Sequence, residues 1–149
     1  KEYSTTGNRE IDGVLNYMLQ KANRTLNQVD VQINIPEDLY FNNFNICVIL
    51  GNLVDNAVRE ASKSEEKLLT IKMQIKQEVL LIFIENSYSG KILEKKNGLQ
   101  TTQTELAIHG IGLENVKKVV LANGGEIKTD YTSDRFCVQV LLYMSQIKN

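Results

Sequence analysis

Cysteine and histidine, which form disulfide frameworks and metal clusters, are scarce in this 149-residue chain, since it has two cysteines and one histidine. It also has one proline and no tryptophan. Cys47 and Cys137 lie far apart in the sequence and both fall within apolar patterns, so we expect reduced, packed thiols in a cytosolic setting. The lone histidine, His109, has no cysteine or second histidine beside it, which argues against a zinc site.

The chain also lacks an excess of charge of either sign and any long apolar run. Its 17 Lys and Arg residues and 18 Asp and Glu residues give a net charge of −1, which argues against a nucleic-acid-binding or polybasic membrane surface. No apolar stretch approaches ~18 residues, the length of a membrane-spanning helix, and we see no signal peptide. We therefore expect this part of the protein to make no direct contact with a membrane.

Length and composition predict one folded domain that comprises residues 1–149. Hydrophobic residues make up 42% of the chain and charged residues 23%, as is ordinary for a globular protein. A chain of this length can bury a full core. Because the first residue is not Met, we expect the sequence to be a fragment of a longer protein.

Apolar periodicity predicts the order α-β-α-β-β-α-β-β, with a long polar segment before the last helix. We expect helices at residues 8–26, 44–62 and 113–123, and strands at 29–35, 69–76, 79–84, 127–131 and 136–143. The predicted fold class is α/β. We expect a two-layer sandwich in which three helices cover one face of a mixed, mostly antiparallel sheet of about five strands.

The polar segment, residues 87–109, is rich in Lys, Asn, Gln, Thr and Gly. A polar segment of this length inside a small domain is more often a functional lid than an idle linker. A short helix near residues 104–107 is expected within it.

The predicted helix at 44–62 has a polar face that differs from an ordinary solvated one. Asn52 and Asn56 are four residues apart, so they stack on one face, with Asp55 and Arg59 beside them. Asn and Asp are poor helix formers, whereas their oxygens are hard ligands that suit a magnesium ion held between protein and phosphates. The alternative is a buried helix whose asparagine pair caps neighbouring loops.

A second polar element opens the helix that follows the long polar segment, and it reads His109-Gly110-Ile111-Gly112-Leu113. Glycines let the backbone approach a ligand closely, and the free N–H groups of a first helical turn can face an anion. The pattern therefore indicates a phosphate-binding lid that ends here, although a flexible hinge would read the same way.

Three motifs, taken together, resemble those of the GHKL ATPases, the superfamily of histidine kinases, gyrase, heat-shock chaperones and mismatch-repair ATPases. Residues 52–59 resemble its asparagine box (N-L-x-x-N-A-x-K/R), and residues 110–113 resemble its second glycine box. Residues 84–90 occupy the place of its Asp-x-Gly-x-Gly adenine box. There Asn86 stands at the Asp position and Tyr88 at the first Gly, whereas Gly90 is retained.

The resemblance implies a Bergerat fold with a long ATP lid, which binds ATP and Mg²⁺. It implies that Asn56 is the magnesium ligand, and that Asn52, Asn56 and Arg59 are the catalytic residues. The implied nucleotide-binding residues are Asn52, Asn56, Arg59, Asn86, Gly90, His109, Gly110, Ile111, Gly112 and Leu113. A neutral amide makes a weaker hydrogen bond to the adenine amine than a carboxylate does, so we expect weak nucleotide binding. Without the other two motifs, residues 84–90 would read as an ordinary strand-ending turn.

The amino-acid sequences of the motifs are similar to those of the AgrC-like quorum-sensing branch of sensor histidine kinases. The similarity rests on residues 6–12, 51–57, 85–88 and 109–113. It implies a dimeric membrane sensor that reads a peptide signal and phosphorylates a response regulator. In that case this chain is a cytoplasmic domain that donates the γ-phosphoryl group of ATP to a histidine on a separate phosphoacceptor domain.

Asn52 separates this reaction from ATP hydrolysis. In the water-hydrolysing members of the superfamily a Glu stands four residues before the magnesium asparagine, and Asn52 cannot accept a proton in its place. A water-hydrolysing ATPase is therefore disfavoured. The main alternative is a degenerate nucleotide-binding module that regulates or docks a partner without phosphotransfer.

Two residues near the motifs keep open roles. His109 either donates a hydrogen bond to phosphate or packs at the hinge of the lid. Asp55 is expected first to hold its helix against a neighbouring strand or loop, and only second to take part in the site.

Overall fold

The structure is a computed structural model that describes residues 8–35, 43–89 and 113–143. Its elements are, in chain order, α1 (Arg9–Thr25), β1 (Gln28–Asn34), α2 (Asn43–Ser62), β2 (Leu68–Lys76), β3 (Val79–Ser87), α5 (Glu114–Ala122), β4 (Glu126–Tyr131) and β5 (Arg135–Tyr143). This order is the predicted one. The short helix predicted near residues 104–107 lies outside the described residues.

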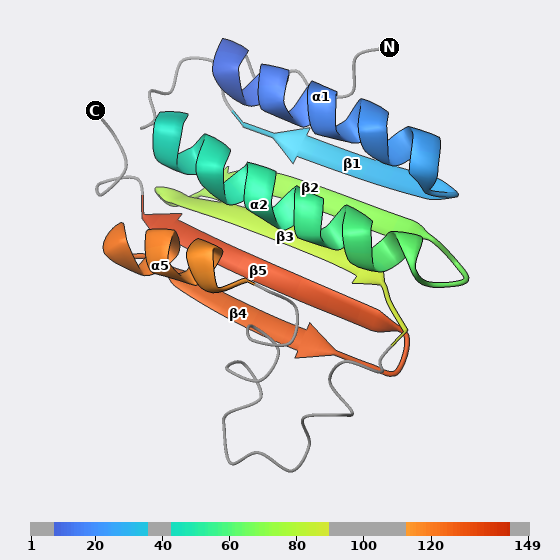
Figure 1. The fold of residues 1–149 in the computed structure, drawn as a ribbon. Helices are drawn as coiled ribbons and strands as arrows, with labels where there is room; N and C mark the ends of the chain where they lie inside the picture. Colours follow the sequence, from blue (N-terminus) through green and yellow to red (C-terminus); the bar gives the residue numbers. More distant parts are fainter. Residues whose placement is uncertain (1–7, 36–42, 90–112, 144–149) are drawn as a thin grey trace, which may run out of the picture.

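One five-stranded sheet organises the molecule, with the strand order β1-β2-β3-β5-β4. β1 pairs parallel to β2, and all other neighbours pair antiparallel. The three described helices lie on one face of this sheet, and β3 is its middle strand (Figure 1). The predicted two-layer α/β sandwich is confirmed.

The core lies between the sheet and its helices. Strand residues alternate between this layer and the open face, so that Leu80, Ile82 and Ile84 of β3 are buried. The predicted inward residues of β5 are confirmed, since Phe136, Val138, Val140 and Leu142 are all buried. The apolar stripe of α2 is buried over its length, at Ile46, Ile49, Leu50, Leu53, Val54, Ala57 and Ala61.

Local signals set the ends of several elements. Asn8 caps α1 as predicted, because its side-chain oxygen accepts a hydrogen bond of 3.2 Å from the N–H of Ile11. Gln77 and Glu78 form the tight β2–β3 turn with positive φ angles of 51° and 63°. Gly124, just past the end of α5, has φ 71°, a conformation that suits glycine at a helix end.

The predicted end of the middle strand at residue 84 is wrong. β3 continues to Ser87, because it pairs with β2 as far as Asn86 and with β5 as far as Ser87. The polar sequence of residues 85–87 hides this pairing. The first residues of the adenine-box segment are consequently held within the sheet.

Cys47 and Cys137 are free thiols that are partly buried, in agreement with the expectation of reduced thiols. Within the described residues, no helix combines the length and apolarity needed to cross a membrane.

Candidate functional site

The polar face of α2 forms the first wall of the candidate site. Asn56 is buried, with 6% of its surface exposed, and Asn52 is partly buried one turn earlier. The Nδ2 of Asn52 donates a hydrogen bond of 2.8 Å to the carbonyl oxygen of Val48. No group within the described ranges donates to the Oδ1 of Asn52, so this side chain offers a ligand an oxygen.

Arg59 holds the amide of Asn56 in a defined orientation. Its Nη2 donates a hydrogen bond to Asn56 Oδ1, and its Nη1 lies 3.1 Å from Asp55 Oδ2. The Asp55 side chain is 53% exposed, and among the described residues it forms an ion pair with Arg59, four residues later in the same helix. Within the described residues, Asp55 therefore pairs with Arg59 of its own helix, and the expectation that it holds α2 against a neighbouring strand or loop stays a prediction.

The geometry of Asn56 fits a magnesium ion that arrives with phosphates. Its buried Oδ1 faces the guanidinium of Arg59, so the oxygen already points at a cationic group. The described part of the chain has no group of three or more His, Cys, Asp and Glu residues that could hold a metal by itself. A single amide oxygen suits Mg²⁺, which takes most of its ligands from phosphates and water.

α5 brings its N-terminus alongside the same stretch of α2. The Nδ2 of Asn45, near the start of α2, donates a hydrogen bond of 3.1 Å to Oδ1 of Asn123, just after α5, and the two helices run in opposite directions (Figure 1). Both helices rise about 1.5 Å per residue. Glu114, nine residues before Asn123, therefore lies roughly level with Val54, nine residues after Asn45.

The start of α5 has an apolar residue at its N-cap position. Leu113 stands at the N-cap position, where it makes no side-chain hydrogen bond to the first turn. A leucine side chain cannot accept hydrogen bonds from the N–H groups of a first helical turn, as a phosphate could. That Leu113 belongs to a phosphate site stays a prediction.

The end of β3 supplies the third wall. Asn86 is 4% exposed, and its alternation with Ile84 and Ile82 places it on the helix-covered face of the sheet. One N–H of its Nδ2 donates to the carbonyl oxygen of Ser87 at 2.8 Å. Its Oδ1 accepts no hydrogen bond within the described part of the chain, so it remains available as an acceptor.

Tyr88 explains how the chain tolerates a large residue at a glycine position of the family motif. Its φ angle is not positive, so the backbone here does not require glycine. The buried Tyr88 hydroxyl donates a hydrogen bond of 2.6 Å to the carbonyl oxygen of Thr132, and its ring packs against Phe136 with centroids 5.9 Å apart. Tyr88 therefore anchors the end of β3 to the β4–β5 turn.

Hydrogen bonds tie the end of α2 to the end of β3. The hydroxyl oxygens of Ser64 and Ser87 lie 2.7 Å apart, and Ser87 also accepts a hydrogen bond of 2.9 Å from the N–H of Leu68. A cavity of about 400 Å³ opens at this junction. Its lining residues are Lys63, Ser64, Glu65, Glu66, Ser87, Tyr88, Ser89, Ser133 and Asp134.

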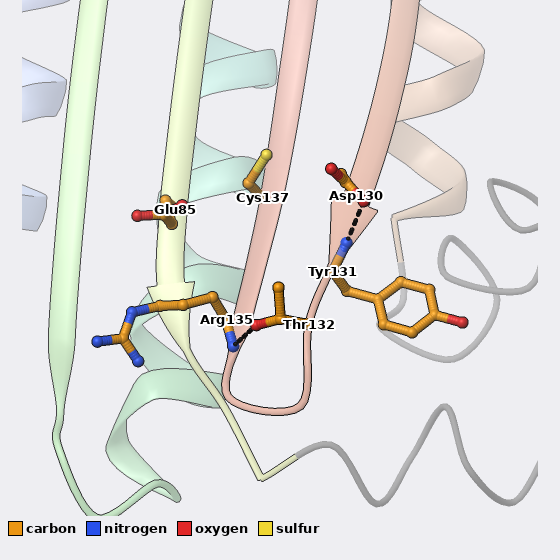
Figure 2. A pocket seen from close by; sticks show the side chains of 6 residues that line it. All are labelled: Glu85, Asp130, Tyr131, Thr132, Arg135 and Cys137. Atoms are coloured by element: carbon orange, nitrogen blue, oxygen red, sulfur yellow. Dashed lines mark hydrogen bonds between the residues drawn. The ribbon is translucent and has the colours of Figure 1, made fainter.

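A smaller pocket on the sheet has a different character. Figure 2 shows Glu85, Arg135 and Cys137 among its lining residues, on the side of the strands opposite to the helices. Its volume is about 60 Å³, far below the several hundred Å³ that a nucleotide-sized ligand fills. Burial, with the negative charges of Glu85 and Asp130, raises the pKa of the Cys137 thiol, which favours the protonated form over the reactive thiolate.

The sequence interpretation overlooked Glu60. This carboxylate is buried, with 7% of its surface exposed, and lies one turn after Asn56 on the same side of α2. The signal was its spacing, because Asn52, Asn56 and Glu60 recur every four residues. Among predicted site residues, Gly90, His109, Gly110, Ile111 and Gly112 lie outside the described ranges.

The fold is an α/β domain in which α2, with its polar face, packs against both α5 and β3, the strand that carries the buried amide of Asn86 near its end. The sequence model of a family described as the GHKL domain matches residues 41–143. The chain belongs to this GHKL family. No curated protein matches the sequence.

Solved structures show the same fold at low sequence identity. The Acinetobacter baumannii histidine kinase AdeS gives a TM-score of 0.67 at 19% identity, over 91% of this chain and 64% of that chain. The catalytic domain of histidine kinase ThkA gives 0.63 at 20% identity, over 93% and 92%. A blue-light activated histidine kinase from Erythrobacter litoralis EL346 gives 0.63 at 15% identity, over 98% and 64%. The chain therefore has the fold of histidine kinase catalytic domains and spans less than two thirds of the AdeS structure.

Proposed function

We propose that residues 1–149 form the ATP-binding catalytic domain of a sensor histidine kinase of the AgrC-like branch. The domain binds ATP with Mg²⁺ and passes the γ-phosphoryl group to a histidine on a separate phosphoacceptor domain. The observation that carries the proposal is the buried Asn56, whose Oδ1 points at a cationic group on a helix beside the uncapped start of α5.

Each residue of the site has a role in this proposal. Asn56 Oδ1 and phosphate oxygens hold the magnesium ion, which when bound neutralises charge on the phosphates. Arg59 releases Asn56 and turns to the triphosphate, while Asp55 keeps its guanidinium close to the site. The N–H groups at the start of α5 face the phosphates. Asn86 Oδ1 accepts a hydrogen bond from the adenine amine.

The chemical step is positioned by the protein and completed by another domain. The bond between the γ-phosphorus and the bridging oxygen breaks, ADP leaves, and a bond to an imidazole nitrogen forms. Asn52 offers an oxygen but no base, so water in the site is not activated. We propose that the domain belongs to the cytoplasmic part of a membrane-anchored dimer that signals to a response regulator.

Equilibrium dialysis with Mg-ATP tests the proposal. We expect the wild-type chain to bind ATP weakly and the Asn56→Ala variant to bind at least about tenfold more weakly, because the metal loses its protein ligand. Asn34→Ala makes the same chemical change on the exposed side of β1 and should bind like wild type. Thermal unfolding confirms that each variant is folded.

Two results would separate the proposal from its alternatives. Equal binding by wild type and the Asn56→Ala variant would contradict the assigned site. No binding of ATP at all would favour the alternative of a regulatory module that docks a partner without phosphotransfer. Labelled ATP added to this domain together with its upstream helical region then tests the transfer itself.

A further inference from the structure

We infer that Glu60 is the carboxylate that recognises the adenine base and that it compensates for the asparagine at position 86. The inference rests on the proposed function, because it names a specificity residue within the same nucleotide site. Glu60 and Asn86 would together present hydrogen-bond acceptors to the base, which would favour adenine over a 6-oxopurine.

The first argument is the burial of Glu60. Only 8% of its side chain is exposed, and within the described residues it forms an ion pair with Lys63 at 3.5 Å, whose own side chain is 59% exposed. No group within the described ranges donates a hydrogen bond to the second carboxylate oxygen, Oε1. Among the described residues, the one enclosed side-chain oxygen or nitrogen without a partner is Oγ1 of Thr129, so Oε1 of Glu60 keeps some accessible surface. Oε1 can therefore accept a hydrogen bond from a ligand.

The second argument is its position along α2. Asn52, Asn56 and Glu60 recur every four residues on one side of the helix, so they lie along the wall of one site. The phosphate-facing start of α5 is level with Val54, and Glu60 lies further along, in the last turn of α2. This order places Glu60 away from the phosphates and toward the base.

The third argument is the junction between α2 and β3. The 2.7 Å hydrogen bond between the hydroxyl groups of Ser64 and Ser87 fixes the end of the helix beside the end of the strand. Glu60 lies one helical turn before Ser64, and Asn86 directly precedes Ser87. Two buried polar side chains thus approach the same corner from the two layers, and both carry an oxygen without a donor in the described part of the chain.

The chemistry of these oxygens selects a base. Asn86 Oδ1 and Glu60 Oε1 are acceptors, so they suit the amino group at position 6 of adenine. A 6-oxo group is itself an acceptor, so it could not form a hydrogen bond with either Asn86 Oδ1 or Glu60 Oε1. The wild-type chain should therefore bind ATP best, purine riboside triphosphate less well, and inosine triphosphate least.

The experiment measures equilibrium binding of these three magnesium nucleotides, and of 2′-deoxy-ATP, to the wild-type chain and to the Glu60→Gln and Glu60→Ala variants. A glutamine can donate to a 6-oxo group. We expect Glu60→Gln to lower ATP affinity about tenfold, to raise inosine triphosphate affinity, and so to shift their ratio by more than tenfold. Glu60→Ala should lose the preference without gaining inosine triphosphate binding. Glu10→Gln, the same charge change at an exposed position at the start of α1, should leave the ratio unchanged.

The outcomes separate this inference from the proposed function. Wild type that prefers ATP, with an unchanged ATP to inosine triphosphate ratio in Glu60→Gln, would overturn the role of Glu60 and leave the kinase assignment intact. A variant that loses only its discrimination against 2′-deoxy-ATP would assign Glu60 to the ribose and also overturn it. If the variants do not fold, the wild-type chain still provides a test, because equal affinity for ATP and inosine triphosphate would contradict base recognition by Glu60 and Asn86. Wild type that binds no nucleotide contradicts both proposals.

Discussion

Tyr88 shows at the scale of one residue how a departure from a family motif can serve the fold. Its hydroxyl and ring make long-range contacts, to Thr132 and Phe136, that a glycine could not make. The side chain is buried among residues of the β4–β5 hairpin. The position therefore stabilises the strand end that carries Asn86.

We expect Tyr88→Phe to lower the free energy of unfolding by about 1–2 kcal/mol, because the carbonyl oxygen of Thr132 loses its donor. Tyr88→Gly, which restores the family residue, should lower it by about 3–5 kcal/mol through loss of a buried aromatic ring. Tyr143→Phe removes an exposed hydroxyl whose hydrogen bond to Glu126 is 3.4 Å long, and it should have almost no effect. Urea unfolding measures all three, and equal losses for Tyr88→Phe and Tyr143→Phe would contradict the anchor.

Cys137 offers a second test at the residue scale. Burial raises the pKa of its thiol, and the negative charges of Glu85 and Asp130 raise it further. In a Cys47→Ser background we expect iodoacetamide to react more slowly with Cys137 than with free cysteine at pH 7.5, since the thiolate is scarcer. Glu85→Gln should move the midpoint of the pH–rate curve to lower pH, as followed by intact-mass measurements. An unmoved midpoint would show that the carboxylate does not act on the thiol.

At this scale the asparagine box and the leucine at the start of α5 can be recognised in the sequence, because both depend on neighbours within one helix, and their roles in a nucleotide site stay predictions. Glu60 could not be recognised in the same way. A glutamate in a helix usually marks a solvated face, and only the tertiary packing of α2 shows that this one is buried. The contacts of Tyr88 join residues 44 positions apart and were equally invisible.

Gly125 sets the approach of α5 to the sheet at the scale of elements. A Cβ atom at this position would lie 2.5 Å from the carbonyl oxygen of Leu141 and 2.9 Å from Cδ2 of Leu142. The backbone between α5 and β4 would have to move away from β5. Because the start of α5 faces the phosphates in our proposal, such a shift would reach the proposed site.

We expect Gly125→Ala to lower the free energy of unfolding by about 1–3 kcal/mol through overpacking. Gly13→Ala is the matched control, because nothing lies within 4 Å of its added Cβ in the middle of α1. It should instead raise stability by about 0.5–1 kcal/mol, since alanine is the better helix former. Thermal or urea unfolding of both variants checks the contrast, and a neutral Gly125→Ala would mean that the connection is free to relax.

The turn after α2 is held to β5 by an ion pair that makes stability depend on pH. Arg135 Nη1 and Nη2 lie 2.7 and 3.0 Å from the two carboxylate oxygens of Glu66. The hydrogen bond from Arg135 lowers the pKa of Glu66 below its ordinary value of 4.5. A lowered folded-state pKa contributes stability above the ordinary value, and the contribution is lost as the pH falls through the folded-state value.

Glu66→Gln should therefore reduce the melting temperature slightly at pH 7 and not at all in strong acid, where the wild-type carboxylate is also protonated. The pair is exposed, so the difference should shrink further at 1 M salt. Scanning calorimetry between pH 2 and pH 7 measures it. A difference that persists at the acid end would show that the glutamine acts by packing and not by charge.

The order and type of the elements were predictable because each strand and helix carries its own period. The end of β3 was not, since residues 85–87 are polar and their pairing is decided by β2 and β5. The same pairing also fixes the position of Asn86. When partners distant in the sequence decide where a strand ends, the periodicity of that strand alone cannot predict its end.

At the scale of the whole molecule, our proposal gives the domain a nucleotide site in which Asn52 stands in place of the base that would activate water. The oxygen that Asn52 presents cannot accept a proton at neutral pH, and in the proposal the phosphoryl acceptor lies on another domain. We expect the isolated wild-type chain to release phosphate from Mg-ATP no faster than about the background rate. The domain would then keep ATP intact until the histidine of the phosphoacceptor domain reaches the γ-phosphoryl group.

Replacing Asn52 with a carboxylate should change that behaviour. Asn52→Glu places a proton acceptor one turn before Asn56, and we expect phosphate release to rise about tenfold to a hundredfold, since a positioned general base contributes about 10²–10⁴ when well placed. Asn52→Gln has the same length without a base and should stay at background. A continuous phosphate assay with both variants decides the matter. A rise in both would point to loosened packing around Val48, and rapid hydrolysis by wild type would show that the domain activates water by another route.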